Sequence, residues 1–195
     1  VTYVDADGLS LGKVAAMGAV DISTTTADLT ISQNISATAI KLNAGQVTAA
    51  GTATGGNVIL TGSPSLTASM GNAIIYTGSI AVSTGVAEST TSDSGNFRYN
   101  ADETTNFSTG GWTDLGVTGN YAVYREQPVI SVAAVNKTVT YGDADPTRYT
   151  GSYTGLLNGD AASIVTGTET AVWDNAALTG DTTSSGGKRR VGDYD

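Results

Sequence analysis

The residue types on which most enzymes and metal sites depend are scarce in this sequence of 195 residues. It has no histidine and no cysteine, so the commonest general base, the commonest metal ligand and every thiolate site are missing. Asp21 and Lys41 are the best remaining pair, because they occupy equivalent positions of two similar segments, 20–22 and 40–42. Such side chains on one face of a solenoid could act on polysaccharides. A lateral ion pair between neighbouring coils is the simpler expectation.

Two Asp-x-Asp pairs are the only other arrangement that invites a metal. Asp5 and Asp7, followed by a glycine, resemble the start of a calcium loop, but a bidentate Glu is needed at its twelfth position, where Ala16 stands. Asp and Gly are also ordinary turn residues, so we expect a turn there. Asp143 and Asp145 lie in a similar turn cluster. We therefore predict no catalytic residue, no cofactor, no metal and no enzymatic activity.

The elements that must position these side chains repeat along the first part of the chain. Short apolar-x-apolar steps begin at Val20, Ile40, Val58 and Ile74, separated by loops rich in Gly, Asn, Thr and Ala. Self-similarity at a period of about 20 residues is typical of a β-solenoid. We predict a short right-handed parallel β-helix over residues 1–90. The side chains predicted to point inward or to pack between elements are Val20, Ile22, Leu29, Ile31, Ile40, Leu42, Val58, Leu60, Ile74 and Tyr76.

From Glu88 the repetition stops and aromatic residues appear, so residues 91–128 are predicted to be a capping and transition segment. Residues 119–125 read as one strand within it. Trp112, Tyr121 and Tyr124 could stack on sugar rings, which keeps a glycan-binding module open as an alternative function. They are equally what a hydrophobic cap needs.

Residues 129–195 have a different pattern, in which predicted strands and turns alternate at short, regular intervals. We predict an immunoglobulin-like β-sandwich. The family resemblance described in the next paragraph implies that this sandwich is incomplete, because Val191 and Tyr194 look like the beginning of a further strand of that module. A sandwich without its last strands leaves an edge that a strand from elsewhere must cover. The residues we assign to such assembly strands are Val1, Val4, Leu9, Leu11, Val191 and Tyr194.

Two stretches carry a family likeness. GNFRYNADE (95–103) followed by YAVYREQP (121–128) resembles the end of the filamentous-haemagglutinin-type β-helix, found in surface adhesins exported by two-partner secretion. VNKTVTYGDADP (135–146) with GLLNGD (155–160) resembles the mostly-β, glycine-rich repeat module called MBG or YDG. The resemblance implies a secreted, bacterial cell-surface location and a role in adhesion or display, with no catalytic residues.

Charge and composition indicate which classes of partner the chain is expected to bind. The formal net charge is −9, which disfavours nucleic acid and anionic lipid, and no apolar run is long enough to insert into a membrane. The resemblance implies a receptor or glycan on a host or neighbouring cell, and an outer-membrane transporter during export. Copies of the chain itself, joined in a fibre by strand addition, are a further expected partner. The function predicted is that of a structural stalk and display segment.

Overall fold

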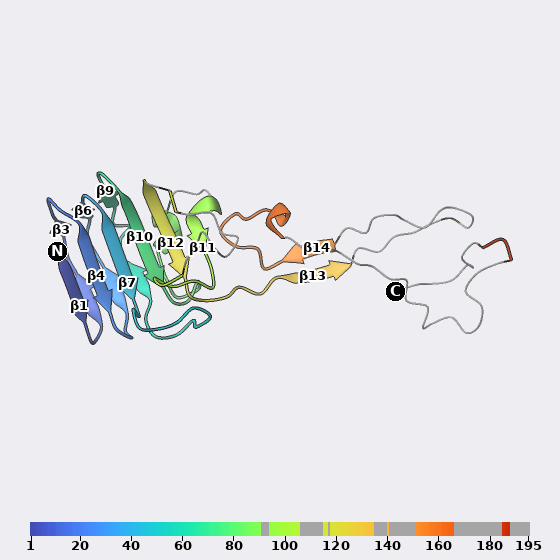
Figure 1. Ribbon diagram of the computed structural model, residues 1–195, viewed down its shortest axis with the longest axis horizontal. Coiled ribbons are helices and arrows are strands. Elements are labelled where there is room, and N and C mark those ends of the chain that lie inside the picture. The colour runs from blue at the N-terminus through green and yellow to red at the C-terminus, as the bar shows by residue number, and fades with distance from the viewer. Residues whose placement is uncertain are drawn as a thin grey trace. The chain divides into compact units, whose positions relative to one another are not determined.

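The computed structural model describes residues 1–90, 94–105, 115–116, 118–134, 140, 151–165 and 185–187 (Figure 1). The chain divides into two compact units. The first comprises Val1–Val129 with Leu157–Asp160, and the second Ile130–Leu156 with Ala161–Asp195. Nearly all regular structure in the described residues is β-strand, which confirms the all-β prediction.

A six-stranded parallel sheet forms one side of the first unit. Its order is β1-β4-β7-β10-β12-β11, and Figure 1 shows these strands side by side. Every neighbouring pair runs in the same direction. The strands are β1 (Thr2–Asp5), β4 (Val20–Thr24), β7 (Ile40–Ala44), β10 (Asn72–Thr77), β12 (Gly119–Tyr124) and β11 (Phe97–Arg98).

Two smaller parallel sheets complete the coils. One has the order β2-β5-β8 and the other β3-β6-β9, so each of the first three coils gives one strand to each of three sheets. This pairing fits the predicted parallel β-helix; its handedness stays a prediction. The strands are β2 (Leu9–Leu11), β5 (Leu29–Ile31), β8 (Val58–Leu60), β3 (Val14–Ala15), β6 (Ile35–Ala37) and β9 (Leu66–Ala68).

The core follows from the alternation of apolar residues on these strands. Val20 pairs with Ile40 and Ile22 with Leu42, so equal positions of successive coils stack on one another. Side chains at alternate positions of a strand share a face, and here that face is buried. The prediction is confirmed for Val20, Ile22, Leu29, Ile31, Ile40, Leu42, Val58 and Leu60, which are all at most 4% exposed.

At the next coil the two predicted residues, Ile74 and Tyr76, pack between elements and do not point inward. Ala73 pairs with Ile40 and Ile75 with Leu42, so these two residues continue the inner row. Ile74 and Tyr76 lie on the opposite face, although Tyr76 is buried there between elements, in a second cluster. Four consecutive apolar residues give no alternation from which a face could be chosen.

The remaining elements are short. Helices in the described residues are α1 (Val86–Ser89) and two single turns, η1 (Ser94–Asn96) and η2 (Ala162–Ile164). None of the described helices is long and apolar enough to span a membrane. In the second unit, β13 (Ser131–Ala134) and β14 (Gly151–Thr154) form an antiparallel pair. That pair lies where strands were predicted; the sandwich around it stays a prediction.

Strands also run through the segment predicted to be a cap. β12 pairs with β10 over its whole length, from Gly119 opposite Asn72 to Tyr124 opposite Thr77. β11 then pairs with β12 at the edge of the sheet. These are the last two strands in the order of the six-stranded sheet. The predicted strand over residues 119–125 is confirmed.

Candidate functional site

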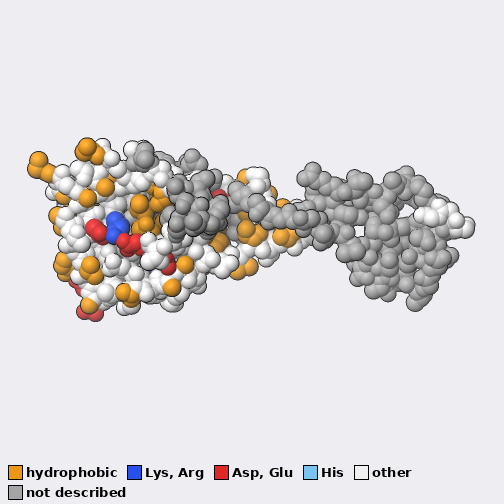
Figure 2. Space-filling model, in the orientation of Figure 1, with side chains coloured by type: hydrophobic (Ala, Val, Ile, Leu, Met, Phe, Trp, Pro, Cys, Tyr) orange, Lys and Arg blue, Asp and Glu red, His pale blue; other side chains and the backbone are white. Residues whose placement is uncertain are grey.

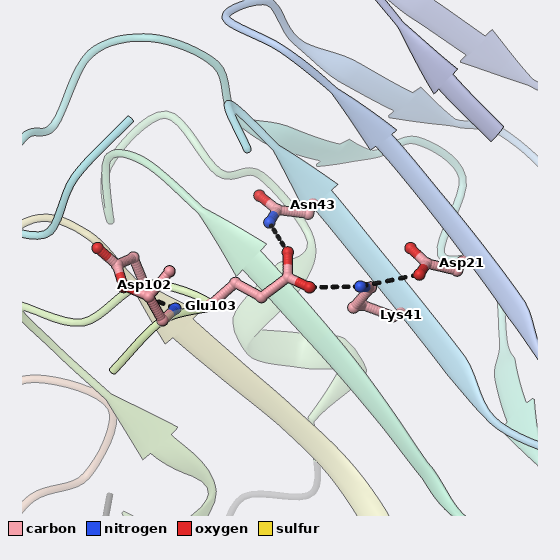
Figure 3. A network of polar contacts seen from close by, with 6 residues as sticks. Asp21, Lys41, Asn43, Asp102 and Glu103 are labelled. Carbon is pink, nitrogen blue, oxygen red and sulfur yellow. Dashed lines mark hydrogen bonds and ion pairs between the residues drawn. The ribbon is translucent and has the colours of Figure 1, made fainter. Parts of the chain in front are cut away.

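The strongest grouping of charged side chains lies on the outer face of the six-stranded sheet. Asp21 on β4 and Lys41 on β7 occupy paired positions, and Lys41 Nζ lies 2.8 Å from Asp21 Oδ2 (Figure 3). The side chains are 34% and 28% exposed, so solvent screens the pair only in part. The predicted lateral ion pair between neighbouring coils is thus confirmed. In Figure 2 blue and red side chains lie side by side near the middle of the first unit, and further red side chains lie apart from them at its lower edge.

Glu103 is the third member of this group, and nothing in the local sequence pointed to it. One of its carboxylate oxygens accepts a hydrogen bond from Lys41 Nζ. The other accepts from Asn43 Nδ2 at 2.7 Å (Figure 3). Lys41 and Asn43 are two positions apart on β7, so their side chains lie on the same, outer face of that strand. Glu103 therefore fixes its own segment to the middle of the sheet.

Asp102 holds the same segment to a loop. Its Oδ2 accepts from the Ala50 backbone N–H at 2.9 Å, and its Oδ1 accepts from Thr104 N–H at 2.9 Å and Thr104 Oγ1 at 2.7 Å. Beside it, Ala101 packs with Tyr76 and Val123 in the second apolar cluster. Residues 101–105, which we call the strap, thus cover the outer face of β10 and β12.

The electrostatics of the network favour fixed charges. Burial by itself lowers the pKa of Lys41, but hydrogen bonds to Asp21 and Glu103 outweigh it and raise the pKa. A lysine in that state stays protonated and cannot serve as a nucleophile or a base. Burial raises the pKa of Asp102, yet the donors Thr104 and Ala50 outweigh it and the net shift is downward. The arrangement can therefore hold chain segments together.

Arg125 is a second feature that sequence reasoning missed. It follows β12 directly, is 1% exposed, and donates from Nη1 to Ala44 O and from Nη2 to Gly56 O, both at 2.6 Å. The two carbonyls stand at the two ends of the loop of residues 45–56, so the guanidinium closes its neck. Gly45 is required there: an added Cβ would lie 2.1 Å from Gly55 O, at a φ of +86°. Burial lowers the pKa of Arg125.

The structure removes two residues from the predicted glycan-stacking set. Tyr121 and Tyr124 lie on β12 and are 7% and 1% exposed, so neither ring face is open to a sugar. Tyr124 packs in the core and stacks on Tyr99, with ring centroids 5.7 Å apart. These rings are buried hydrophobic side chains, as the alternative interpretation of the same residues predicted. Trp112 lies outside the described residues.

The Asp5 region is a turn, as predicted. Asp5 Oδ1 accepts from Asp7 N–H at 2.9 Å, and Asp5 Oδ2 accepts from Tyr3 Oη at 2.8 Å. The hydrogen bond from Asp7 N–H and, to a lesser extent, the one from Tyr3 Oη lower the pKa of Asp5. No group of three or more acidic side chains in the described part of the chain is arranged to hold a metal. Asp143 and Asp145 lie outside that part.

The residues assigned to assembly strands have mixed positions. Val1 and Val4 are 71% and 49% exposed, at the strand that forms one edge of the six-stranded sheet. Leu9 and Leu11, on β2, are partly buried against the core. β1 is hydrogen-bonded to β4 and β2 to β5, so only the outer edge of each strand is free for another partner. Val191 and Tyr194 lie outside the described residues.

Comparison with known proteins identifies one part of the chain. The family model of the MBG domain (YGX type) matches residues 130–195. This confirms the MBG resemblance for that segment, about a third of the sequence. Neither the curated proteins nor the solved structures contain a significant match. The filamentous-haemagglutinin resemblance of the first unit has no support from these comparisons and stays a prediction.

Proposed function

We propose that this chain is a structural segment of a secreted bacterial surface adhesin or extracellular fibre, in which the coils supply a stalk and a surface for display. The observation that carries the proposal is the register of three successive coils: Val20 lies over Ile40, and Ile40 over Ala73, and all three are buried. Each coil adds one strand to the same sheet without changing the buried row. Such a stack gains length with each repeat.

Two further observations support it. The match over residues 130–195 is to the MBG domain, which is typical of extracellular surface proteins. The charged groups of the first unit, Lys41 with Glu103 and Arg125 with Ala44, are engaged in holding segments to the stack. We assign no catalytic role to them. Export by a two-partner-secretion transporter belongs to the same proposal. Attachment to a receptor or glycan on another cell is assigned to the adhesin as a whole, through a part other than this stalk.

Insertion of a coil tests the stalk. Val20 pairs with Ile40, so a tandem copy of residues 20–39 adds one complete turn in register. The variant is expected to keep its melting temperature and to lengthen by about 4.8 Å, the spacing of neighbouring strands, measured by small-angle scattering. The matched control is a copy one residue shorter, which turns the inserted apolar side chains outward and should unfold the neighbouring coils. Unfolding of both variants alike would contradict the stalk.

A binding experiment separates the stalk from a glycan-binding module. The 195-residue chain, immobilised on beads, is presented to a glycan array and to epithelial cells. A stalk gives no saturable binding in either assay. Saturable binding to one class of sugar would overturn the stalk and favour the glycan-binding alternative, with Trp112 as the first residue to substitute.

Assembly into a fibre is a second candidate, favoured by one observation. Within the described residues, β1, β2 and β3 each have a hydrogen-bonded neighbour on one side only. Open strand edges accept strands from another chain. The purified chain is then expected to form concentration-dependent filaments by sedimentation, and Val4→Lys should abolish them by placing a charge on the edge. A stable monomer at high concentration would contradict assembly.

A further inference from the structure

The tight turn of residues 157–160 contacts Tyr99, the tyrosine that stacks on Tyr124. Asn158 and Gly159 have φ values of +49° and +79°, as the central residues of a type I′ turn do, and Asp160 N–H donates to Leu157 O at 2.8 Å. Asn158 Nδ2 donates to Tyr99 Oη at 2.7 Å. Residues 157–160 belong to the same compact unit as Tyr99, so this hydrogen bond is a tie within that unit.

The pair Asn158–Gly159 also has a distinctive chemistry. Asn158 is the asparagine that glycine follows, whereas every other asparagine in the sequence precedes a residue with a side chain. A following glycine leaves the next backbone nitrogen unhindered, and that nitrogen can attack the asparagine side-chain carbonyl. Gly159 is exposed, and an added Cβ at this position would meet nothing within 4 Å. Space around Gly159, whose nitrogen attacks, is therefore open.

We propose that Asn158–Gly159 is a site of spontaneous deamidation that releases the turn of residues 157–160 from Tyr99. The Gly159 backbone nitrogen bonds to Asn158 Cγ and loses its proton, the Cγ–Nδ2 bond breaks, and ammonia leaves. Water then opens the cyclic imide. Cleavage between Cγ and the nitrogen gives aspartate, and cleavage at the backbone carbonyl gives isoaspartate. The reaction needs no reactant other than water.

The leaving group is the atom that makes the tie. Nδ2 is the donor to Tyr99 Oη, so each reaction event removes that donor and leaves a carboxylate. The new charge arises two residues from Asp160, whose carboxyl is partly buried, and beside a half-buried phenol. The isoaspartate product also lengthens the backbone within a turn whose two positive φ values fit an unmodified chain. Both products should therefore loosen residues 157–160.

The molecule provides its own internal control. Asn100 has almost the same φ, +51°, but the buried Ala101 follows it. The purified chain is incubated at mildly alkaline pH, and peptide mass spectrometry follows the replacement of amide NH2 by OH. Asn158 is expected to react several-fold faster than Asn100, with isoaspartate among the products. Gly159→Ala, which adds a Cβ in open space but strains a backbone with a φ of +79°, should suppress the reaction, and it is therefore compared only with its own fresh sample.

Hydrogen exchange then tests the release. Aged wild-type protein is expected to exchange amide hydrogens of residues 157–160 faster than fresh protein, whereas aged Gly159→Ala protein matches its own fresh sample. Equal reaction rates at Asn158 and Asn100 would overturn the site. Deamidation with unchanged exchange around Tyr99 and Leu157 would overturn the release.

Discussion

Leu42 offers the most direct measurement of how the coils depend on one another. It is fully buried on β7, with Ile22 paired to it on one side and Ile75 on the other. Leu→Ala in a core costs about 2 to 5 kcal/mol, depending on how far the surroundings collapse into the cavity. Backbone hydrogen bonds hold both neighbouring strands in place, so we expect little collapse and a cost of about 3 to 4 kcal/mol for Leu42→Ala.

The assay is thermal unfolding of the whole chain followed by circular dichroism. At roughly 3 °C per kcal/mol for a unit of this size, the melting temperature should fall by about 10 °C. Val4→Ala is the matched control, because Val4 is 49% exposed on an edge strand and should lose at most about 1 kcal/mol. A fall for Leu42→Ala no larger than for Val4→Ala would refute the stacking of coils as the source of stability.

Three other perturbations test the contacts around the loop and the strap. Arg125→Met removes the donors to Ala44 O and Gly56 O and should cost about 2 to 4 kcal/mol by chemical denaturation, with faster hydrogen exchange in residues 45–56. The pKa of the Asp102 carboxyl is lower in the folded chain than the unfolded value of 3.8. Its contribution to stability is therefore present above pH 3.8 and is lost as the pH falls through the lower folded pKa. When stability is measured against decreasing pH, Asp102→Asn should lack this loss. Dialysis against a chelator should leave the melting temperature unchanged, and a fall that calcium reverses would contradict the prediction that the chain holds no metal.

The repeating part of the fold could be predicted because local pattern and burial agree there. In the strands from Val20 to Ala44 apolar and polar residues alternate, so the period itself selects the buried face. The pairing of Asp21 with Lys41 followed from the same period. At Ile74 and Tyr76 the pattern failed, because both faces of β10 are covered and both are therefore apolar.

The parts of the site that could not be predicted depend on contacts between distant segments. Glu103 reaches Lys41 across 62 positions of sequence, and no local period links the two. Arg125 is buried although arginine is mostly a surface residue. The glycines of residues 45–56 indicate a tight loop, but no local pattern links that loop to Arg125, which reaches it across 69 and 81 positions.

The buried side chain of Arg125 explains how β12, a strand outside the repeat, is added to the regular stack of coils. β12 follows β10 in the sheet, but residues 78–118 separate the two strands in the chain, so the coil period does not fix the register of β12. Arg125, at the end of β12, can reach both Ala44 O and Gly56 O in one register only, because a slip by one residue would turn it to the other face. A slip would leave a buried cation without those acceptors, which is far more costly than a displaced methyl group. The charge therefore specifies the position of the last long strand, whereas the aliphatic core supplies most of the stability.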